Sequence, residues 1–223
     1  MQKFFSIAID GPAGAGKSTV AKAVARELGA AYLDTGAMYR TLGLYMNQRG
    51  LVRPEAIARA AAEPAVEVRF EGDEQRMLLG GEDVTDRIRT PEASMFASRV
   101  SAVPEVRQRL VELQREIAKG HSVVMDGRDI GTHVLPNATL KIYLTASCEV
   151  RAQRRYDELV RSGREVSYED VLSDIVQRDY NDSHRAVSPM RQAEDAVRVD
   201  TSEMTAEEAV AAIVRRARER IDG

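Results

Sequence analysis

The sequence contains little of what several protein classes require. Among 223 residues only Cys148 is a cysteine, which excludes an internal disulfide framework and fits a reducing cytoplasm. The three histidines are scattered and offer no metal-ligand spacing. No charged flank followed by a long apolar stretch marks a signal peptide or a membrane span. We therefore expect a cytoplasmic protein that is not secreted and has no membrane partner.

Excess charge of one sign is also missing. The net charge is −3 at pH 7, so nucleic acid is not an expected partner and any anion must be bound by local arginine clusters. The hydrophobic content of 43% suffices for one substantial core with small inserted subdomains. The mixed charges of a helix predicted over 206–221 indicate a solvated face, so we expect a monomer.

A phosphate-binding motif follows the first apolar run. Residues 11–18 match G-x-x-x-x-G-K-[ST] between a strand predicted over 4–9 and a helix predicted over 19–28. Free amides and the positive dipole at a helix N-terminus suit phosphate oxygens. A glycine-rich turn with a surface lysine is the alternative, and it leaves the flanking strand and helix unexplained. We expect a nucleoside triphosphate to be bound by Gly11, Pro12, Ala13, Gly14, Ala15, Gly16, Lys17, Ser18 and Thr19.

The remaining apolar runs are short and alternate with helical patterns, which predicts a parallel α/β sheet. They lie at 31–33, 123–125, 140–144 and 196–199. Residues 66–84 break this rhythm: alternating residues at 66–70, a turn at 71–75, and short strands at 76–79 and 82–84 predict a small antiparallel insertion. Helix ends are indicated by Gly29, Pro54, Gly120 and the capping-box pair Thr205 and Glu208.

A charged segment, 151–185, interrupts the alternation and is interpreted as a mobile flap. Arg151, Arg154 and Arg155 have spacing that places three cations on one helix face, with Glu158 offsetting part of their repulsion. A triphosphate would complement this stripe. A solvated helix face is the alternative.

Further along, Arg178, Asp182 and Arg185 also share one helical face, which suits a polar, phosphorylated ligand. A simple surface ion pair between Arg178 and Asp182 is the alternative.

Polar residues follow two predicted strands where ligands of parallel sheets collect. After 31–33, Asp34 or Thr35 can cap a helix that carries Tyr39 and Arg40, so an acceptor molecule could bind there; a helix cap with an amphipathic tyrosine is the alternative.

After 123–125, Asp126 is the candidate metal-organising carboxylate, while Arg128 would clamp phosphate and Asp129 would accept hydrogen bonds. An Asp-Gly turn is the alternative for this second segment.

Four ordered motifs, at 9–17, 33–40, 126–129 and 178–185, make the whole chain resemble the bacterial cytidylate kinases. The resemblance implies transfer of the γ-phosphoryl group of ATP to CMP or dCMP. It also implies a P-loop nucleoside monophosphate kinase fold: an α/β fold with a five-stranded parallel sheet flanked by helices, a small antiparallel β insertion and a helical lid. A single kinase unit, 1–223, would comprise a core (1–34, 120–150 and 186–223), an acceptor-binding region (35–119) and lid and acceptor-contacting helices (151–185).

Site roles follow from the resemblance residue by residue. The acceptor phosphate region would be lined by Thr35, Tyr39, Arg40, Arg128 and Arg178, and Asp182 would contact the ribose. Cytosine would be read by Ser98, Arg107, Asp129 and Arg185. The family often carries serine at the position of Thr35, and the retained hydroxyl makes the change tolerable. ATP would be bound with Mg²⁺ held by Ser18 and Asp126. The negative charge of the transition state would be stabilised by Lys17, Arg128, Arg154 and Arg155.

Two other functions are compatible with parts of the sequence. A related kinase could act on UMP, AMP or shikimate, which an acceptor screen separates. A nucleotide-dependent switch could share the phosphate loop, but the guanine-reading Asn-Lys-x-Asp element is absent from the sequence.

Overall fold

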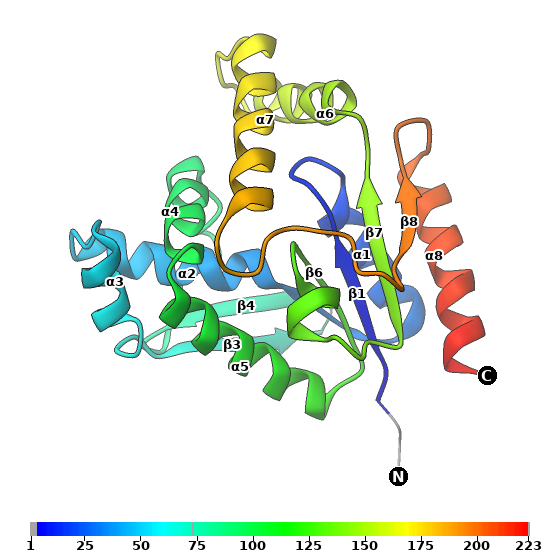
Figure 1. The fold of residues 1–223 in the computed structure, drawn as a ribbon, viewed down its shortest axis with the longest axis horizontal. Coiled ribbons are helices and arrows are strands. Elements are labelled where there is room, and N and C mark those ends of the chain that lie inside the picture. The colour runs from blue at the N-terminus through cyan, green and yellow to red at the C-terminus, as the bar shows by residue number, and fades with distance from the viewer. Residues whose placement is uncertain (1–3, 73, 223) are drawn as a thin grey trace.

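A five-stranded parallel sheet forms the centre of the molecule (Figure 1), in the order β2-β6-β1-β7-β8. The computed structural model describes residues 4–72 and 74–222. The strands are β1 (Ser6–Asp10), β2 (Ala31–Asp34), β6 (Val123–Gly127), β7 (Leu140–Thr145) and β8 (Val197–Asp200). Each of the five apolar runs therefore overlaps one of these strands, and the predicted parallel sheet is confirmed. The first strand begins at Ser6 rather than at the predicted Phe4.

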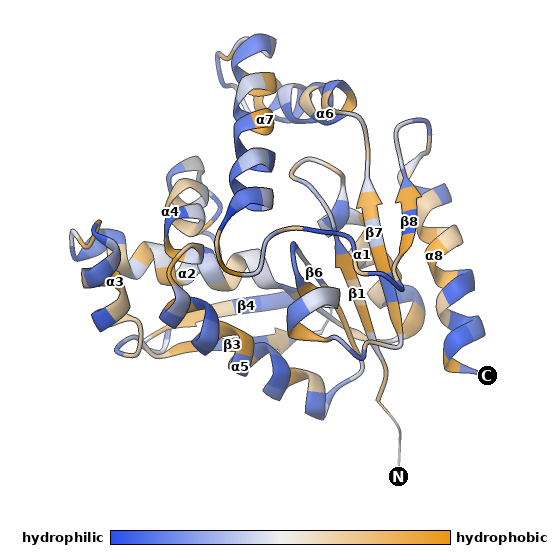
Figure 2. Ribbon diagram, viewed as in Figure 1, coloured by the Kyte–Doolittle hydropathy of each residue, from blue (hydrophilic) through white to orange (hydrophobic). Residues whose placement is uncertain are grey.

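Side chains of the central strands alternate between two hydrophobic cores, because successive residues of a strand point to opposite faces. Ala8 packs in the core with α2 (Thr35–Gln48) and α5 (Pro104–Gly120), whereas Ile7 and Ile9 pack in the core with α1 (Lys17–Leu28) and α8 (Ala206–Ile221). Burial on both faces explains why the strands read as continuous apolar runs. Figure 2 shows this concentration of hydrophobic residues in the sheet.

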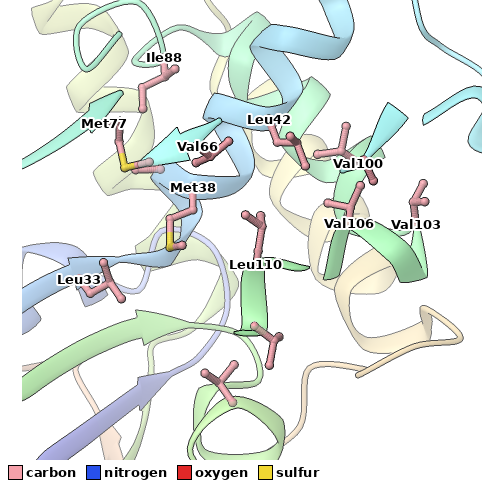
Figure 3. Close-up of a cluster of buried hydrophobic side chains, with 14 of the residues drawn as sticks. Leu33, Met38, Leu42, Val66, Met77, Ile88, Val100, Val103, Val106 and Leu110 are labelled. Atoms are coloured by element: carbon pink, nitrogen blue, oxygen red, sulfur yellow. The ribbon is translucent and has the colours of Figure 1, made fainter. Parts of the chain in front are cut away.

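The predicted antiparallel insertion is confirmed as β3 (Val66–Glu71), β4 (Glu74–Leu79) and β5 (Glu82–Asp83), in that order. It lies between α3 (Pro54–Ala60) and α4 (Pro91–Ser101) along the chain. Met77 of β4 packs in the same core as Met38 of α2 (Figure 3). The insertion thus shares its core with the helix that leaves β2. Residue 73 of the predicted turn, and 1–3 and 223 of the predicted kinase unit, lie outside the described residues.

The charged segment predicted as a flap is helical. It forms α6 (Cys148–Arg161) and α7 (Tyr168–His184), which lie above the carboxyl ends of the central strands (Figure 1). A small cluster of their own, built on Ala152, Val171 and Ile175, holds the two helices together. Between β6 and β7 the chain makes one short helical turn, η1 (Ile130–Val134). None of the helices in the described ranges is long and apolar enough to cross a bilayer.

Replacing Thr205 by alanine is expected to lower the free energy of unfolding by about 1 kcal/mol. The Thr205 hydroxyl accepts a hydrogen bond from the Glu208 amide at 3.2 Å, and the Glu208 carboxylate accepts one from the Thr205 amide at 2.9 Å. The predicted capping box is therefore confirmed, and the substitution removes half of it. Urea unfolding measures the loss. Glu203→Ala, an exposed change just outside α8, is the control, and equal stability of the two variants would contradict the prediction.

Candidate active site

The phosphate loop connects β1 to α1 as the motif predicts, although α1 begins at Lys17 rather than at Thr19. Gly14 and Gly16 have positive φ values of 76° and 83°, which favour glycine. A Cβ on Gly11 would collide with the Leu144 carbonyl oxygen of β7, so only glycine fits there. Gly16 caps α1 without a side-chain acceptor. The first amides of α1 therefore receive no hydrogen bond from a cap side chain, the condition that an anion-binding helix start requires.

Lys17 is the first residue of α1 and is only 6% exposed. Its Nζ donates to the Pro12 carbonyl oxygen at 2.7 Å. Burial lowers the pKa of Lys17, and the positive charge of Arg128 lowers it further. An anionic phosphate beside Lys17 would oppose both effects, so the site favours such a ligand.

Asp126, the penultimate residue of β6, is buried next to the phosphate loop and accepts hydrogen bonds from two hydroxyl groups. The Ser18 Oγ donates to one carboxylate oxygen at 2.8 Å, and the Tyr32 hydroxyl donates to the other at 3.0 Å. Burial raises the pKa of Asp126, and so does Asp34, its partner in the β2–β6 register. A cation would relieve the crowding of these two carboxylates.

This set of oxygen donors fits Mg²⁺, which is commonly bound by one or two carboxylates, a hydroxyl, water and substrate phosphates. Within residues 4–72 and 74–222 no group of three His, Cys, Asp or Glu side chains could hold a metal unaided. Water and the phosphates of a bound nucleotide would supply the remaining ligands of a metal here.

The start of α2 presents the second group of predicted residues. Asp34 caps the helix by accepting from the Ala37 amide at 2.9 Å and pairs with Arg40 at 2.7 Å. The Thr35 hydroxyl donates to the Asp126 carbonyl oxygen at 2.7 Å, which ties α2 to β6. Sequence reasoning missed Gln75 of β4, whose amide bonds both backbone groups of Asp34, at 2.7 and 3.2 Å. The insertion thus holds the start of α2 in place.

A buried cluster of charges forms around Asp129. Its carboxylate pairs with Arg107 of α5 and, at 3.2 Å, with Arg185 at the end of α7. Arg107 is 2% exposed, and its Nε has no hydrogen-bond partner among the residues that the structure describes. A buried donor without a partner is costly, so a ligand with an acceptor atom here would be favoured. Ser98 of α4 lines the cavity that this cluster also borders.

The charged residues on the predicted face of α7 form other ion pairs than their spacing suggests. Asp182 pairs with Arg128 at 2.8 Å, whereas Arg178 lies 3.7 Å from Asp174. The alternative of an Arg178–Asp182 ion pair is therefore wrong. Arg178, Asp182 and Arg185 nevertheless all line one cavity, as a ligand-binding face requires.

The prediction that three arginines of α6 face a ligand together is only partly correct. Arg154 and Arg155 line the cavity; Arg154 donates to Thr201, and Arg155 pairs with Glu158 at 2.8 Å as expected. Arg151 does not line it: its side chain is buried against the phosphate loop and α7. Helical spacing identifies a shared face but not which part of that face the fold buries.

The phosphate loop, the start of α2, the Asp129 cluster and the ligand-facing residues of α6 and α7 border one cavity of about 650 Å³. Of the predicted site residues, the structure brings to its wall Ala13, Gly14, Gly16, Lys17, Ser18, Thr19, Thr35, Tyr39, Arg40, Ser98, Arg107, Asp126, Arg128, Asp129, Arg154, Arg155, Arg178, Asp182 and Arg185. It does not bring there Gly11, Pro12 and Ala15. These three residues support the loop away from the cavity wall. The Pro12 carbonyl oxygen accepts from Lys17, and Ala15 is buried.

Sequence reasoning also missed Asp10, although an acidic residue at the end of a buried strand was the signal that identified Asp126. The Asp10 carboxylate, 4% exposed, accepts from the amides of Ile130 and Gly131, both at 2.7 Å. It thereby satisfies the start of η1, leaving Asp129 free to pair with arginines. Burial raises the pKa of Asp10 to about 6 from 3.8, against the effect of these hydrogen bonds.

Asp10→Asn is expected to gain stability relative to the wild type as pH rises from 4 to 7. Between pH 3.8 and about 6 the unfolded chain releases the Asp10 proton while the folded chain retains it, so the wild type loses stability with pH. Asparagine does not titrate, and the relative gain between pH 4 and pH 7 should be about 2 kcal/mol. Urea unfolding at pH 4 and 7 measures the difference between the two proteins. The exposed change Asp157→Asn is the control. A free energy of unfolding of Asp10→Asn that stays constant or falls relative to the wild type between pH 4 and pH 7 would contradict the account.

Comparison with known proteins identifies relatives of the whole chain. The family model described as cytidylate kinase matches residues 7–219. A cytidylate kinase of Fervidobacterium nodosum is 51% identical over 96% of each chain, and one of Mycobacterium leprae is 53% identical over 92% of each. The crystal structure of a gluconokinase from Sinorhizobium meliloti has a TM-score of 0.50 at 15% identity, covering 99% of this chain and 97% of its own, and shares the fold.

Proposed function

This chain belongs to the cytidylate kinase family, and we propose that its cavity binds Mg-ATP and CMP or dCMP together for direct transfer of the γ-phosphoryl group. The reaction is that of an ATP-dependent nucleoside monophosphate kinase, giving CDP or dCDP and ADP. One observation carries the proposal: a single cavity contains the phosphate loop and the buried Asp129 cluster. The loop suits a polyphosphate, and the cluster suits a polar base.

The donor would lie on the phosphate loop. The free amides of α1 and the ammonium of Lys17 would contact its β and γ phosphates. Mg²⁺ would be held by Ser18 directly and by Asp126 through water, and when bound it would neutralise phosphate charge. We assign these functions to the core, residues 1–34, 120–150 and 186–223.

The acceptor would occupy the other part of the cavity, between residues 35–119 and the helices of 151–185. Arg40, Arg128 and Arg178 supply cations for its phosphate, aided by the hydroxyls of Thr35 and Tyr39. Asp182 would accept from the ribose. Ser98 and the paired charges of Arg107, Asp129 and Arg185 would read the hydrogen-bonding edge of cytosine.

Chemistry at this site requires alignment and charge neutralisation. The acceptor is already an anionic phosphate, so no strong general base is needed. Arg128, Arg154 and Arg155 would stabilise the charge that spreads over the transferred group. Closure of α6 and α7 over the cavity would exclude water and so suppress hydrolysis of ATP.

Asp126→Asn tests the metal assignment. The change keeps the shape of the side chain but removes its charge, so the Mg²⁺ concentration for half-maximal turnover should rise roughly 10-fold or more. Turnover with CMP is measured across a Mg²⁺ titration, with EDTA defining the metal-free rate. The exposed substitution Asp86→Asn is the matched control. An unchanged Mg²⁺ dependence in Asp126→Asn would exclude Asp126 from the metal site.

A further inference from the structure

Arg151 is a buried guanidinium that the proposed chemistry does not use. It lies in the first turn of α6, is 4% exposed and is absent from the cavity wall. Its Nε donates to the Ala146 carbonyl oxygen at 2.9 Å, and its Nη2 lies 3.0 Å from the Cys148 sulfur. Its Nη1 makes two further contacts that link distant parts of the chain.

The first of these contacts reaches the phosphate loop. Nη1 donates to the Ala13 carbonyl oxygen at 2.9 Å. The next residue, Gly14, packs so closely that a Cβ there would lie 3.2 Å from both the Cβ and the carbonyl oxygen of Arg151. A shift of the loop backbone must therefore move Arg151 or break its hydrogen bond.

The second contact reaches α7. Nη1 lies 2.7 Å from one carboxylate oxygen of Asp179. The other carboxylate oxygen is buried and has no hydrogen-bond partner within residues 4–72 and 74–222. Asp179 follows Arg178 directly and precedes Asp182, the partner of Arg128, by three residues. Holding Asp179 thus fixes the part of α7 that faces the acceptor.

We propose that Arg151 and Asp179 are a positioning pair that couples the phosphate loop to the acceptor-binding face of α7. The inference rests on the proposed function. Phosphate binding orders the loop backbone, which fixes the Ala13 carbonyl and hence the guanidinium that holds α7. Binding of the first ligand thus orders both the loop and α7, and the second ligand binds without losing that conformational entropy again. Mg-ATP therefore strengthens CMP binding and CMP strengthens Mg-ATP binding by the same factor.

Asp179→Asn is the main test, because this side chain is partly exposed and lies outside the hydrophobic cores. Calorimetry measures the Kd of CMP without and with a saturating Mg²⁺ complex of the β,γ-methylene analogue of ATP. The ratio of the two values is the coupling factor. We expect a wild-type factor clearly above one and a decrease of roughly 3- to 10-fold in the variant. Asp170→Asn, an exposed change of equal charge on the same helix, should keep the wild-type factor.

Arg151→Lys is the second variant. Lysine keeps the charge but cannot span the same acceptors, so it should lower the coupling factor as Asp179→Asn does. Measuring the analogue's Kd without and with CMP must return the same factor in each protein. A wild-type factor of one, or variants that weaken CMP equally in both conditions, would overturn the inference. The proposed function fails separately, if the wild type releases no ADP in response to CMP.

Discussion

Lys17→Ala is expected to lower kcat for CMP phosphorylation by about 10³-fold, the upper range for removing one preorganised donor from a developing anion. The Lys17 ammonium is buried beside the phosphate loop and held by the Pro12 carbonyl oxygen. No other lysine lines the cavity wall in the part of the chain that the structure describes. Its loss therefore removes the one ammonium group that the Pro12 carbonyl oxygen holds beside the phosphate loop in the described residues.

Folding should survive this change. A buried ammonium with one hydrogen bond is costly to desolvate, so alanine should not lower the free energy of unfolding markedly. Steady-state ADP release at saturating ATP and CMP measures kcat, and urea unfolding checks the fold. Lys22→Ala, an exposed change on the same helix, is the matched control. If Lys17→Ala kept more than about a tenth of the wild-type kcat, Lys17 could not be the central phosphate-neutralising group.

Arg128→Ala is expected to lower kcat at saturating CMP by roughly 10³-fold, the lower range for an arginine that stabilises phosphoryl transfer. Arg128 follows the strand that carries Asp126, pairs with Asp182 of α7 and acts electrostatically on Lys17. It is thus a cation near both the donor loop and the acceptor helix. The KM for CMP should rise as well, because Asp182 loses its partner.

The division between kcat and KM decides the role of Arg128. Initial rates across CMP concentrations separate the two quantities, and Arg69→Ala on the exposed side of the insertion controls for loss of one positive charge. An Arg128→Ala enzyme with a raised KM but the wild-type kcat would show uniform binding of the acceptor. The transition-state role would then be wrong.

The features predicted best were those encoded by local pattern. The individual strands, the phosphate loop and the capping box at Thr205 each depend on residues close in sequence, so periodicity and motif spacing identify them. The insertion was recognisable because alternation at 66–70 differs from the buried runs of the parallel sheet.

Contacts between distant segments escaped prediction. Asp10 accepts hydrogen bonds from amides 120 and 121 residues away, and Gln75 bonds the backbone of Asp34, 41 residues away. Sequence spacing cannot predict either contact. Arg151 shared a helical face with Arg154 and Arg155, yet its place beside the loop buried it. Asp182 is four residues from Arg178 on α7 but pairs instead with Arg128, which directly follows β6. Tertiary packing selects among partners that local spacing leaves equal.

The most direct test of the account is ADP release from Mg-ATP with CMP, dCMP, UMP, AMP or shikimate supplied separately, and with no acceptor. The account predicts rapid release with CMP and dCMP and only slow release in the other reactions. Fast release with a different acceptor would contradict the base-reading role of the Asp129 cluster, and release independent of any acceptor would contradict the kinase itself.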